Sequence, residues 1–177
     1  MSVPESKISA QRSVFTTPWF ELIEKTVGDS PHYSIGTQDY VSVFAITKGG
    51  SFPLVRQFRP AIEQVTLELP SGHVDEGQTP EEAALNELRE ETGFIARELI
   101  PLGGLSPDTG RLGNWMWCFF APGVEQDPKN QFTPQAGIEP LLYDRSLRDL
   151  VTATPAFSSA LNRATILMAV AGGHVTL

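Results

Sequence analysis

The pattern of hydrophobic and polar positions divides the chain into a strand-rich first part and a helical last part. Short segments rich in β-branched and aromatic residues alternate with clusters of Gly, Pro, Asp and Ser, which is typical of strands joined by turns. Two more such segments occur later in the chain. Strands are therefore predicted over residues 19–27, 40–47, 53–58, 65–68, 114–121 and 140–143.

A central helix is predicted to begin at Pro80. Thr79 suits the N-cap position and Glu82 the third helical position, which together form a capping box. Gly93 is placed to end this helix, because glycine readily adopts the left-handed backbone found at helix C-termini. The local signals therefore bound the helix at both ends.

The last third of the chain is predicted to be helical over residues 146–153 and 158–171, where apolar residues recur at helical spacing. Strands, a central helix, more strand and closing helices predict an α+β fold, an α/β/α sandwich with a mixed β-sheet. A chain of 177 residues is the size of one well-buried domain. We expect a single domain over residues 14–177 and a flexible polar leader over residues 1–13.

Charge and composition narrow the functional classes. The formal net charge of −8 argues against nucleic-acid binding, which requires a basic surface, but leaves room for a small anionic ligand whose charge a metal and a few arginines offset. No apolar run approaches the roughly 20 residues of a membrane-spanning helix. Without a recognisable signal peptide, a cytoplasmic location is expected. Cys118 has no partner in the chain and is expected to be a buried hydrophobic residue.

Three glutamates share one side of the predicted central helix. Glu87 lies three residues before Glu90 and four before Glu91. Like charges at these spacings repel one another, and Arg89 is the only cation within reach. Mg²⁺ or Mn²⁺ would relieve this repulsion, since both ions prefer oxygen ligands. The alternative is a solvated acidic helix face without a ligand.

The segment from Gly72 to Phe94 resembles the box of the Nudix hydrolases. That box has a Gly, five residues, a Glu, seven residues and the run R-E-U-x-E-E-x-G-U, in which U is apolar. The chain departs from it at Gln78, which replaces the first Glu, and at Asn86, which replaces the Arg. These amides could keep a neutral hydrogen bond in place of the family's ion pair. The seven matching positions of the nine defined ones are Gly72, Glu87, Leu88, Glu90, Glu91, Gly93 and Phe94.

The resemblance implies a divalent metal site, with Mg²⁺ or Mn²⁺ as the cofactor. Glu87 and Glu91 would be the principal ligands, and Glu90 an additional ligand or a partner of the reacting water. The backbone carbonyl of Ser71 or Gly72 would complete the set. By the same resemblance, Glu90 and Glu91 belong to the catalytic group, and the metal would activate a water against a diphosphate.

Two segments before the helix resemble the ADP-ribose and nucleoside-diphosphate-sugar branch of the family. These are residues 56–60, Arg-Gln-Phe-Arg-Pro, and residues 68–72, Glu-Leu-Pro-Ser-Gly. By this resemblance Arg59 would contact the diphosphate and Arg56 the substrate. The alternative for Arg59 is an ion pair with Glu63 or Glu68.

The resemblance also implies roles outside these segments. Trp19 would stack on the nucleobase in a homodimer whose N-terminal strands are exchanged, or it would pack in a core or dimer interface. A late acidic residue would activate the water, and Glu139 is favoured over Glu125 and Asp127 because it directly precedes a predicted strand.

The function predicted from this resemblance is metal-dependent hydrolysis of ADP-ribose or a related nucleoside diphosphate sugar. The products would be a nucleoside monophosphate and a sugar phosphate. Two alternatives stay open, a non-catalytic Nudix-fold nucleotide sensor and a hydrolase of nucleoside triphosphates. The three clustered glutamates favour an enzyme over a sensor, and the two branch-like segments argue against the triphosphate.

Overall fold

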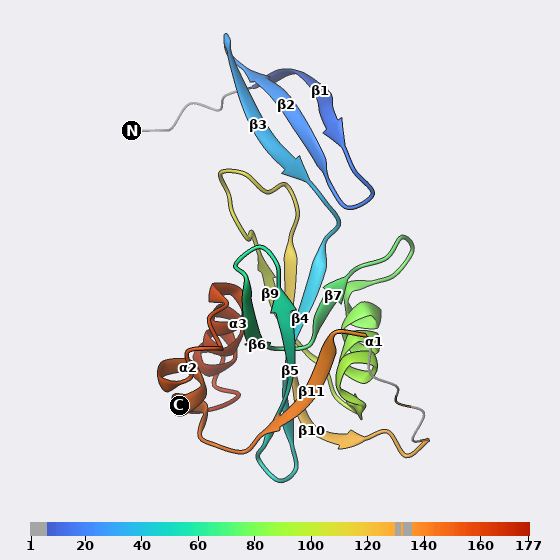
Figure 1. The fold of residues 1–177 in the computed structure, drawn as a ribbon, viewed down its shortest axis with the longest axis vertical. Helices are drawn as coiled ribbons and strands as arrows, with labels where there is room; N and C mark the ends of the chain where they lie inside the picture. Colours follow the sequence, from blue (N-terminus) through green and yellow to red (C-terminus); the bar gives the residue numbers. More distant parts are fainter. Residues whose placement is uncertain (1–6, 130–131, 133–135) are drawn as a thin grey trace. The chain divides into compact units, whose positions relative to one another are not determined.

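The computed structural model describes residues 7–129, 132 and 136–177 and divides the chain into two compact units (Figure 1). Unit 1 comprises Met1–Asp39 and Ser106–Trp115, and unit 2 comprises Tyr40–Leu105 and Met116–Leu177. Within the described residues, none of the helices has the length and apolar character needed to cross a membrane. The single domain expected over residues 14–177 stays a prediction.

Unit 1 is built on a three-stranded antiparallel sheet in the order β1-β2-β3. Its strands are β1 (Ile8–Thr16), β2 (Glu21–Val27) and β3 (Ser30–Gly36). Residues 8–13 are therefore strand rather than part of a flexible leader, which corrects the expectation for that stretch; residues 1–6 lie outside the described residues. The polar residues of β1 make cross-strand pairs instead, as Arg12 Nε does by donating to Glu24 Oε1 at 2.9 Å.

Unit 2 contains a mixed sheet and a separate antiparallel sheet. The parallel pair β4 (Tyr40–Thr47) and β10 (Met116–Gln126) forms the centre of the mixed sheet. Its flanking strands are β7 (Ser71–His73) on β4, and β8 (Phe94–Ile95) and β9 (Ile100–Leu105) on β10. The second sheet has the order β11-β5-β6, with strands β5 (Phe52–Arg59), β6 (Gln64–Glu68) and β11 (Ile138–Tyr143).

The mixed sheet is buried on both faces. The helices of unit 2 are α1 (Pro80–Thr92), α2 (Leu147–Ala153) and α3 (Ala160–Ala171). Phe44 of β4 packs in one core cluster with Ile166 of α3, whereas its neighbour Val43 packs in the other with Leu88 of α1. Successive strand residues point to opposite faces, so α1 and α3 cover opposite sides of the sheet. The predicted α+β sandwich with a mixed sheet is confirmed.

Both ends of α1 follow the sequence prediction. Thr79 Oγ1 accepts from the Glu82 N–H at 3.2 Å, and Glu82 Oε2 accepts from the Thr79 N–H at 2.9 Å. Gly93 ends the helix in the left-handed region, with φ of 75°. The capping box thus fixes where α1 begins, and with it the direction in which the helix presents its glutamates.

Replacing Thr79 tests the capping box. Thr79→Ala removes the hydroxyl that accepts from the Glu82 N–H, and we expect it to lower the free energy of unfolding by about 1 kcal/mol. Thr79→Ser keeps the hydroxyl and is expected to change it by less than half as much. Urea denaturation followed by circular dichroism measures both variants. Equal stability of Thr79→Ala and wild type would contradict the assigned cap.

Candidate active site

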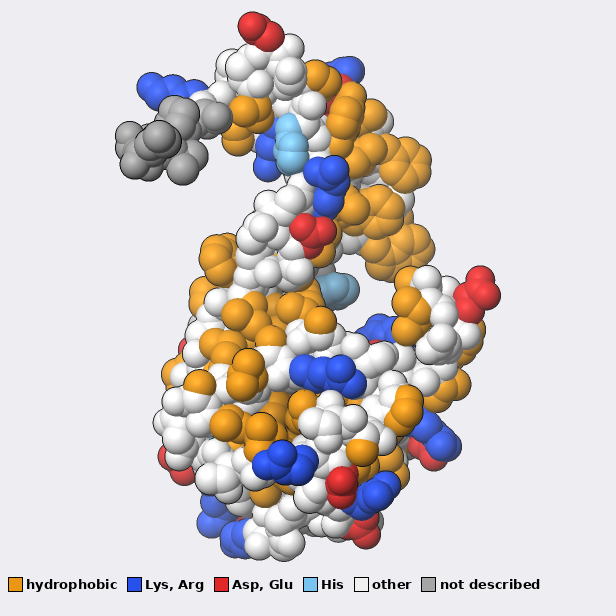
Figure 2. All heavy atoms as spheres, turned by 90° about the vertical axis from the view of Figure 1, so that its left-hand side faces the viewer, with side chains coloured by type: hydrophobic (Ala, Val, Ile, Leu, Met, Phe, Trp, Pro, Cys, Tyr) orange, Lys and Arg blue, Asp and Glu red, His pale blue; other side chains and the backbone are white. Residues whose placement is uncertain are grey.

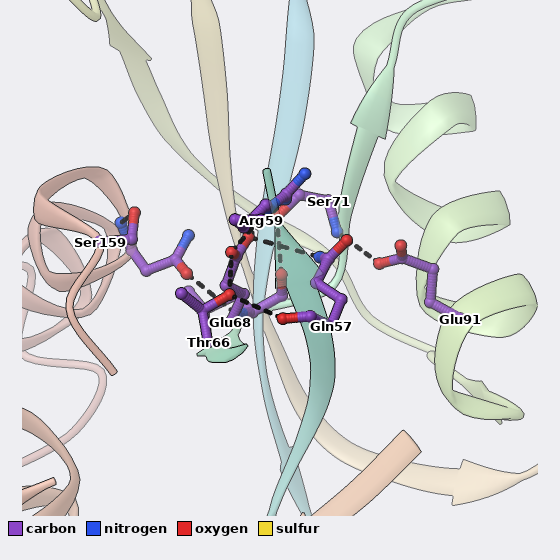
Figure 3. A network of polar contacts seen from close by, with 9 residues as sticks. Gln57, Arg59, Thr66, Glu68, Ser71, Glu91 and Ser159 are labelled. Carbon is purple, nitrogen blue, oxygen red and sulfur yellow. Dashed lines mark hydrogen bonds and ion pairs between the residues drawn. The ribbon is translucent and has the colours of Figure 1, made fainter. Parts of the chain in front are cut away.

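A bidentate ion pair joins Arg59, the last residue of β5, to Glu68, the last residue of β6 (Figure 3). Arg59 donates from Nε to Glu68 Oε1 at 2.8 Å and from Nη2 to Glu68 Oε2 at 2.6 Å. Thr66 Oγ1 donates to Glu68 Oε1 at 2.7 Å. Burial raises the pKa of Glu68, but the hydrogen bonds from Arg59 and Thr66 and the charge of Arg59 outweigh it, so the pKa is lowered. Glu68 therefore stays ionised and holds the guanidinium of Arg59 in one orientation.

The three residues after Glu68 connect this pair to two helices. The Leu69 N–H donates to Asn162 Oδ1 on α3 at 3.1 Å, and Ser71 Oγ donates to the Leu69 carbonyl at 2.6 Å. The Ser71 N–H donates to Glu91 Oε2 on α1 at 2.8 Å. Figure 3 shows the resulting network running from α1 through the centre of unit 2 to α3. A single stretch of backbone thus positions side chains from both covering helices.

The glutamates of α1 do not share one environment. Glu91 is only 4% exposed, and a Cβ atom on Gly72 would overlap the Glu87 carboxylate, so both side chains lie against β7. Glu90 instead points to solvent, where its Oε1 accepts from Arg89 Nη2 at 3.5 Å. Of the three clustered glutamates, only Glu90 is therefore solvent-exposed.

Burial raises the pKa of both inward glutamates. For Glu87 the pKa rises to about 7 through burial and then through the charges of Glu90 and Asp75. For Glu91 it rises to about 8, because burial and the charge of Glu87 outweigh the hydrogen bond from Ser71 and the charge of Arg59. A cation bound beside these neighbouring carboxylates would favour the ionised form of both.

This donor set fits a hard divalent cation. Among the described residues, no three His, Cys, Asp or Glu side chains are grouped closely enough to hold a metal ion. Mg²⁺, however, is usually held by one or two carboxylates, with waters and substrate phosphates completing its coordination. Glu87 and Glu91 place two carboxylates of this kind beside the backbone of β7, where they could hold such an ion.

A cavity of about 450 Å³ opens beside this network within unit 2. Its walls come from β5–β6, from β7 and from the start of α3. Arg59, which is half exposed, faces it, so the guanidinium is accessible to a ligand as well as paired with Glu68. The residues that line it include Arg59, Glu68, Ser71, Gly72, Ser159 and Asn162.

The structure does not bring Arg56 and Glu139 to this cavity. They are cross-strand neighbours on β5 and β11, and Arg56 donates from Nη2 to Glu139 Oε2 at 2.6 Å. Both line a separate open cavity of about 630 Å³ with Phe58 and Val65. The expected roles of Glu139 as catalytic base and of Arg56 in substrate binding find no support in this arrangement, and both stay predictions.

The other acidic candidates also lie in local interactions. Glu125 is ion-paired with Lys48 and with Arg97 on the surface. Asp127 Oδ1 accepts from the Lys129 N–H at 3.0 Å, which is a turn interaction. The structure therefore presents no late acidic residue at the cavity within its described part.

Two further sequence expectations concern Trp19 and the amides of Gln78 and Asn86. Trp19 lies in the turn between β1 and β2 of unit 1 and is 74% exposed, which excludes packing in a core of the described chain. Gln78 Oε1 accepts from the Asp75 N–H at 3.3 Å, and no hydrogen bond joins Gln78 to Asn86 in the described chain. The neutral hydrogen bond expected between the side chains of Gln78 and Asn86 is therefore not formed.

Sequence reasoning missed the contribution of α3. Ser159 caps this helix by accepting from the Asn162 N–H at 3.2 Å, and both residues line the cavity. The available signal was an asparagine among the apolar residues of a predicted helix, because a buried amide needs hydrogen-bond partners. No motif marks this position.

Replacing Gly72 tests the link between β7 and the α1 carboxylates. Gly72→Ala places a Cβ where the Glu87 carboxylate lies, so this flexible side chain must move. We expect Mn²⁺ binding, measured by electron paramagnetic resonance, to weaken about tenfold or more, with only a small change in stability. Gly49→Ala is the control, because its Cβ meets only Thr47 Oγ1 at 3.8 Å. Unchanged Mn²⁺ affinity of Gly72→Ala would contradict the assigned metal position.

Parts of the chain are similar in sequence to known pyrophosphatases. The ADP-ribose pyrophosphatase of Bacillus subtilis (strain 168) is 44% identical over 123 residues, which is 66% of this chain and 66% of that protein. The ADP-sugar pyrophosphatase of Mus musculus is 54% identical over 41 residues, 23% of this chain and 19% of that protein. The matched segments thus span less than two thirds of either relative.

A crystal structure of an ADP compounds hydrolase has the same fold. It aligns with a TM-score of 0.79 over 99% of this chain and 100% of that chain, at 18% sequence identity. The model of the NUDIX domain matches residues 36–142, which is more than half of the chain and includes the box, β7 and α1. The chain therefore belongs to the Nudix family.

Proposed function

We propose that this protein hydrolyses the diphosphate bond of ADP-ribose or a related nucleoside diphosphate sugar. Water adds to one phosphorus, the bond from that phosphorus to the bridging oxygen breaks, and the other phosphate leaves. The products are a nucleoside monophosphate and a sugar phosphate. The observation that carries this proposal is the accessible, oriented guanidinium of Arg59 in a cavity lined by Ser71 and Gly72. Glu91 contacts Ser71, and Glu87 lies against Gly72.

Glu87 and Glu91 would hold Mg²⁺ or Mn²⁺, with the Ser71 carbonyl as a backbone ligand and Glu90 as an outer partner. When bound, the metal neutralises phosphate oxygens and makes a bound water more acidic. Arg59 adds a fixed positive charge for the diphosphate, and Glu68 keeps it extended toward the cavity. The names of the two pyrophosphatase relatives support a nucleoside diphosphate sugar as the substrate class.

The competing function is a nucleotide sensor without hydrolysis. It is favoured by the loss of the box's ion pair, since Gln78 and Asn86 are neutral and not bonded to each other. Both functions require nucleotide binding, and only hydrolysis requires the inward carboxylates of α1.

Product analysis separates the two functions. Purified protein is incubated with ADP-ribose, GDP-mannose, NADH and a nucleoside triphosphate, each with and without Mg²⁺. We expect Mg²⁺-dependent release of AMP and ribose 5-phosphate from ADP-ribose. We further expect Glu91→Gln to lower this turnover by at least about a hundredfold, because it removes a buried carboxylate ligand.

The matched control is Glu81→Gln, which changes an exposed glutamate in the first turn of α1. It is expected to retain turnover within about twofold. Nucleotide binding without turnover of any compound would favour the sensor. Full activity of a folded Glu91→Gln variant would contradict the metal assignment.

We also propose that the chain forms a homodimer through unit 1. Within the described part of this unit, no hydrophobic side chain is buried, whereas Val14, Phe15 and Trp19 are 46%, 57% and 74% exposed. In Figure 2, hydrophobic side chains gather along one side of this part of the chain. An unburied apolar sheet of this kind is typical of an interface, and a second copy of the same sheet would cover it.

In such a dimer, Trp19 would be available to stack on the nucleobase, as the resemblance to the ADP-ribose branch implies. A cytoplasmic location stays a prediction.

Replacing Phe15 tests the dimer. Phe15→Glu places a charge in the exposed apolar sheet and is expected to shift the protein from dimer to monomer, because an interface core excludes unpaired charge. Leu167→Glu makes the same change at an exposed position of α3 in unit 2 and is expected to remain dimeric. Sedimentation equilibrium gives the mass of each. A monomeric wild type, or an unaltered dimer of Phe15→Glu, would contradict this interface.

A further inference from the structure

Asn162 is a buried amide whose orientation is fixed by the backbone of the site. It is the third residue of α3 and only 4% exposed. Its Oδ1 accepts from the Leu69 N–H at 3.1 Å. Because only the oxygen of an amide can accept this bond, the Nδ2 group is the opposite, donating end. Asn162 therefore has one defined rotamer and one defined donor direction.

The Nδ2 group of Asn162 is available to a ligand in the cavity. Within the described part of the chain, Nδ2 makes no hydrogen bond. It is also absent from the fully buried polar atoms that lack a partner, so it is not completely enclosed by protein. The side chain lines the cavity that Arg59 also lines. Buried polar groups in proteins are normally satisfied, so an amide donor that is held in place and open to a cavity indicates a ligand acceptor.

Both walls of the cavity offer hydrogen-bond donors. On one wall, Arg59 commits Nε and Nη2 to Glu68, which leaves the N–H groups of Nη1 for a ligand. On the other, Ser159 Oγ accepts from the Asn162 N–H, which leaves the hydroxyl proton of Ser159 to be donated. The carboxylate of Glu68 is neutralised by its pair. A ligand between these walls is met by donors, which suits a group that only accepts, such as a phosphate.

We infer that Asn162 is a substrate-binding residue that donates from Nδ2 to an oxygen of the substrate diphosphate, opposite Arg59. This inference rests on the proposed function for the identity of the ligand. Glu68 and Leu69 are adjacent, so the same end of β6 orients both donors: the Glu68 side chain holds Arg59, and the Leu69 N–H holds Asn162. The two donors thereby keep a constant separation.

Binding of a substrate analogue tests this role without any chemical step. The probe is ADP-ribose with a methylene group in place of the bridging oxygen, titrated calorimetrically in Mg²⁺. Asn162→Ala removes the donor, and we expect its dissociation constant to rise about 10- to 100-fold, the range for a hydrogen bond to a charged group. Asn162→Asp keeps an acceptor for the Leu69 N–H but loses the donor, and a loss at least as large is expected.

Leu167→Asp is the matched control for the added charge, because it lies on the same helix but is 61% exposed. It is expected to bind the analogue within about twofold of wild type. Mn²⁺ binding to the nucleotide-free protein is measured for every variant. A purely structural role of Asn162, in holding Leu69 and the following Ser71, would weaken Mn²⁺ and analogue binding together.

The outcomes are distinct. Weaker analogue binding of Asn162→Asp with unchanged Mn²⁺ affinity supports the inference. Wild-type analogue affinity of folded Asn162→Ala or Asn162→Asp, or a parallel loss of Mn²⁺ affinity in Asn162→Asp, overturns it. Because the analogue is not cleaved, a wild-type protein that binds it but hydrolyses nothing would refute the proposed hydrolysis and leave the assignment of Asn162 standing.

Discussion

The bidentate pair between Arg59 and Glu68 is the interaction on which the rest of the candidate site depends. A buried carboxylate is costly unless it is paired and hydrogen-bonded, and Glu68 accepts hydrogen bonds from Nε and Nη2 of Arg59 and from the hydroxyl of Thr66. Glu68 in turn holds the long, flexible side chain of Arg59 in one orientation at the edge of the cavity. An anionic substrate then meets a charge whose position does not have to be reorganised when it binds.

The pair also explains why the backbone that follows it has to be exact in register. Directly after Glu68, the Leu69 N–H donates to Asn162 of α3 and the Ser71 N–H donates to Glu91 of α1. The same short backbone segment therefore contacts both helices. A shift of one residue in β6 would reverse the faces to which these groups point. Burial of Glu91 against this stretch, together with the charge of Glu87, raises the pKa of Glu91, and a bound cation would favour the ionised form of both carboxylates.

The sequence predicted the features that local rules determine and missed those that depend on how distant segments of the chain pair. The capping box at Thr79 and the glycine at 93 bounded α1 correctly, because caps act within one turn of helix. The alternation that marks β4 gave its bounds, Tyr40–Thr47. In contrast, the pairing of Arg56 with Glu139, 83 residues apart in the chain, follows from how β11 lies on β5 and has no local signal. The contribution of Asn162 was missed for the same reason: its partner Leu69 is 93 residues away.

We propose that a divalent metal on the inward carboxylates of α1 and a diphosphate facing Arg59 occupy one continuous site. The most direct measurement is the anomalous scattering of Mn²⁺ in crystals grown with the methylene analogue of ADP-ribose. We expect a Mn²⁺ peak bonded to Glu87 and Glu91, with the phosphorus atoms between that peak and the guanidinium of Arg59. Mn²⁺ bound away from both carboxylates, or a diphosphate without contact to Arg59, would contradict it.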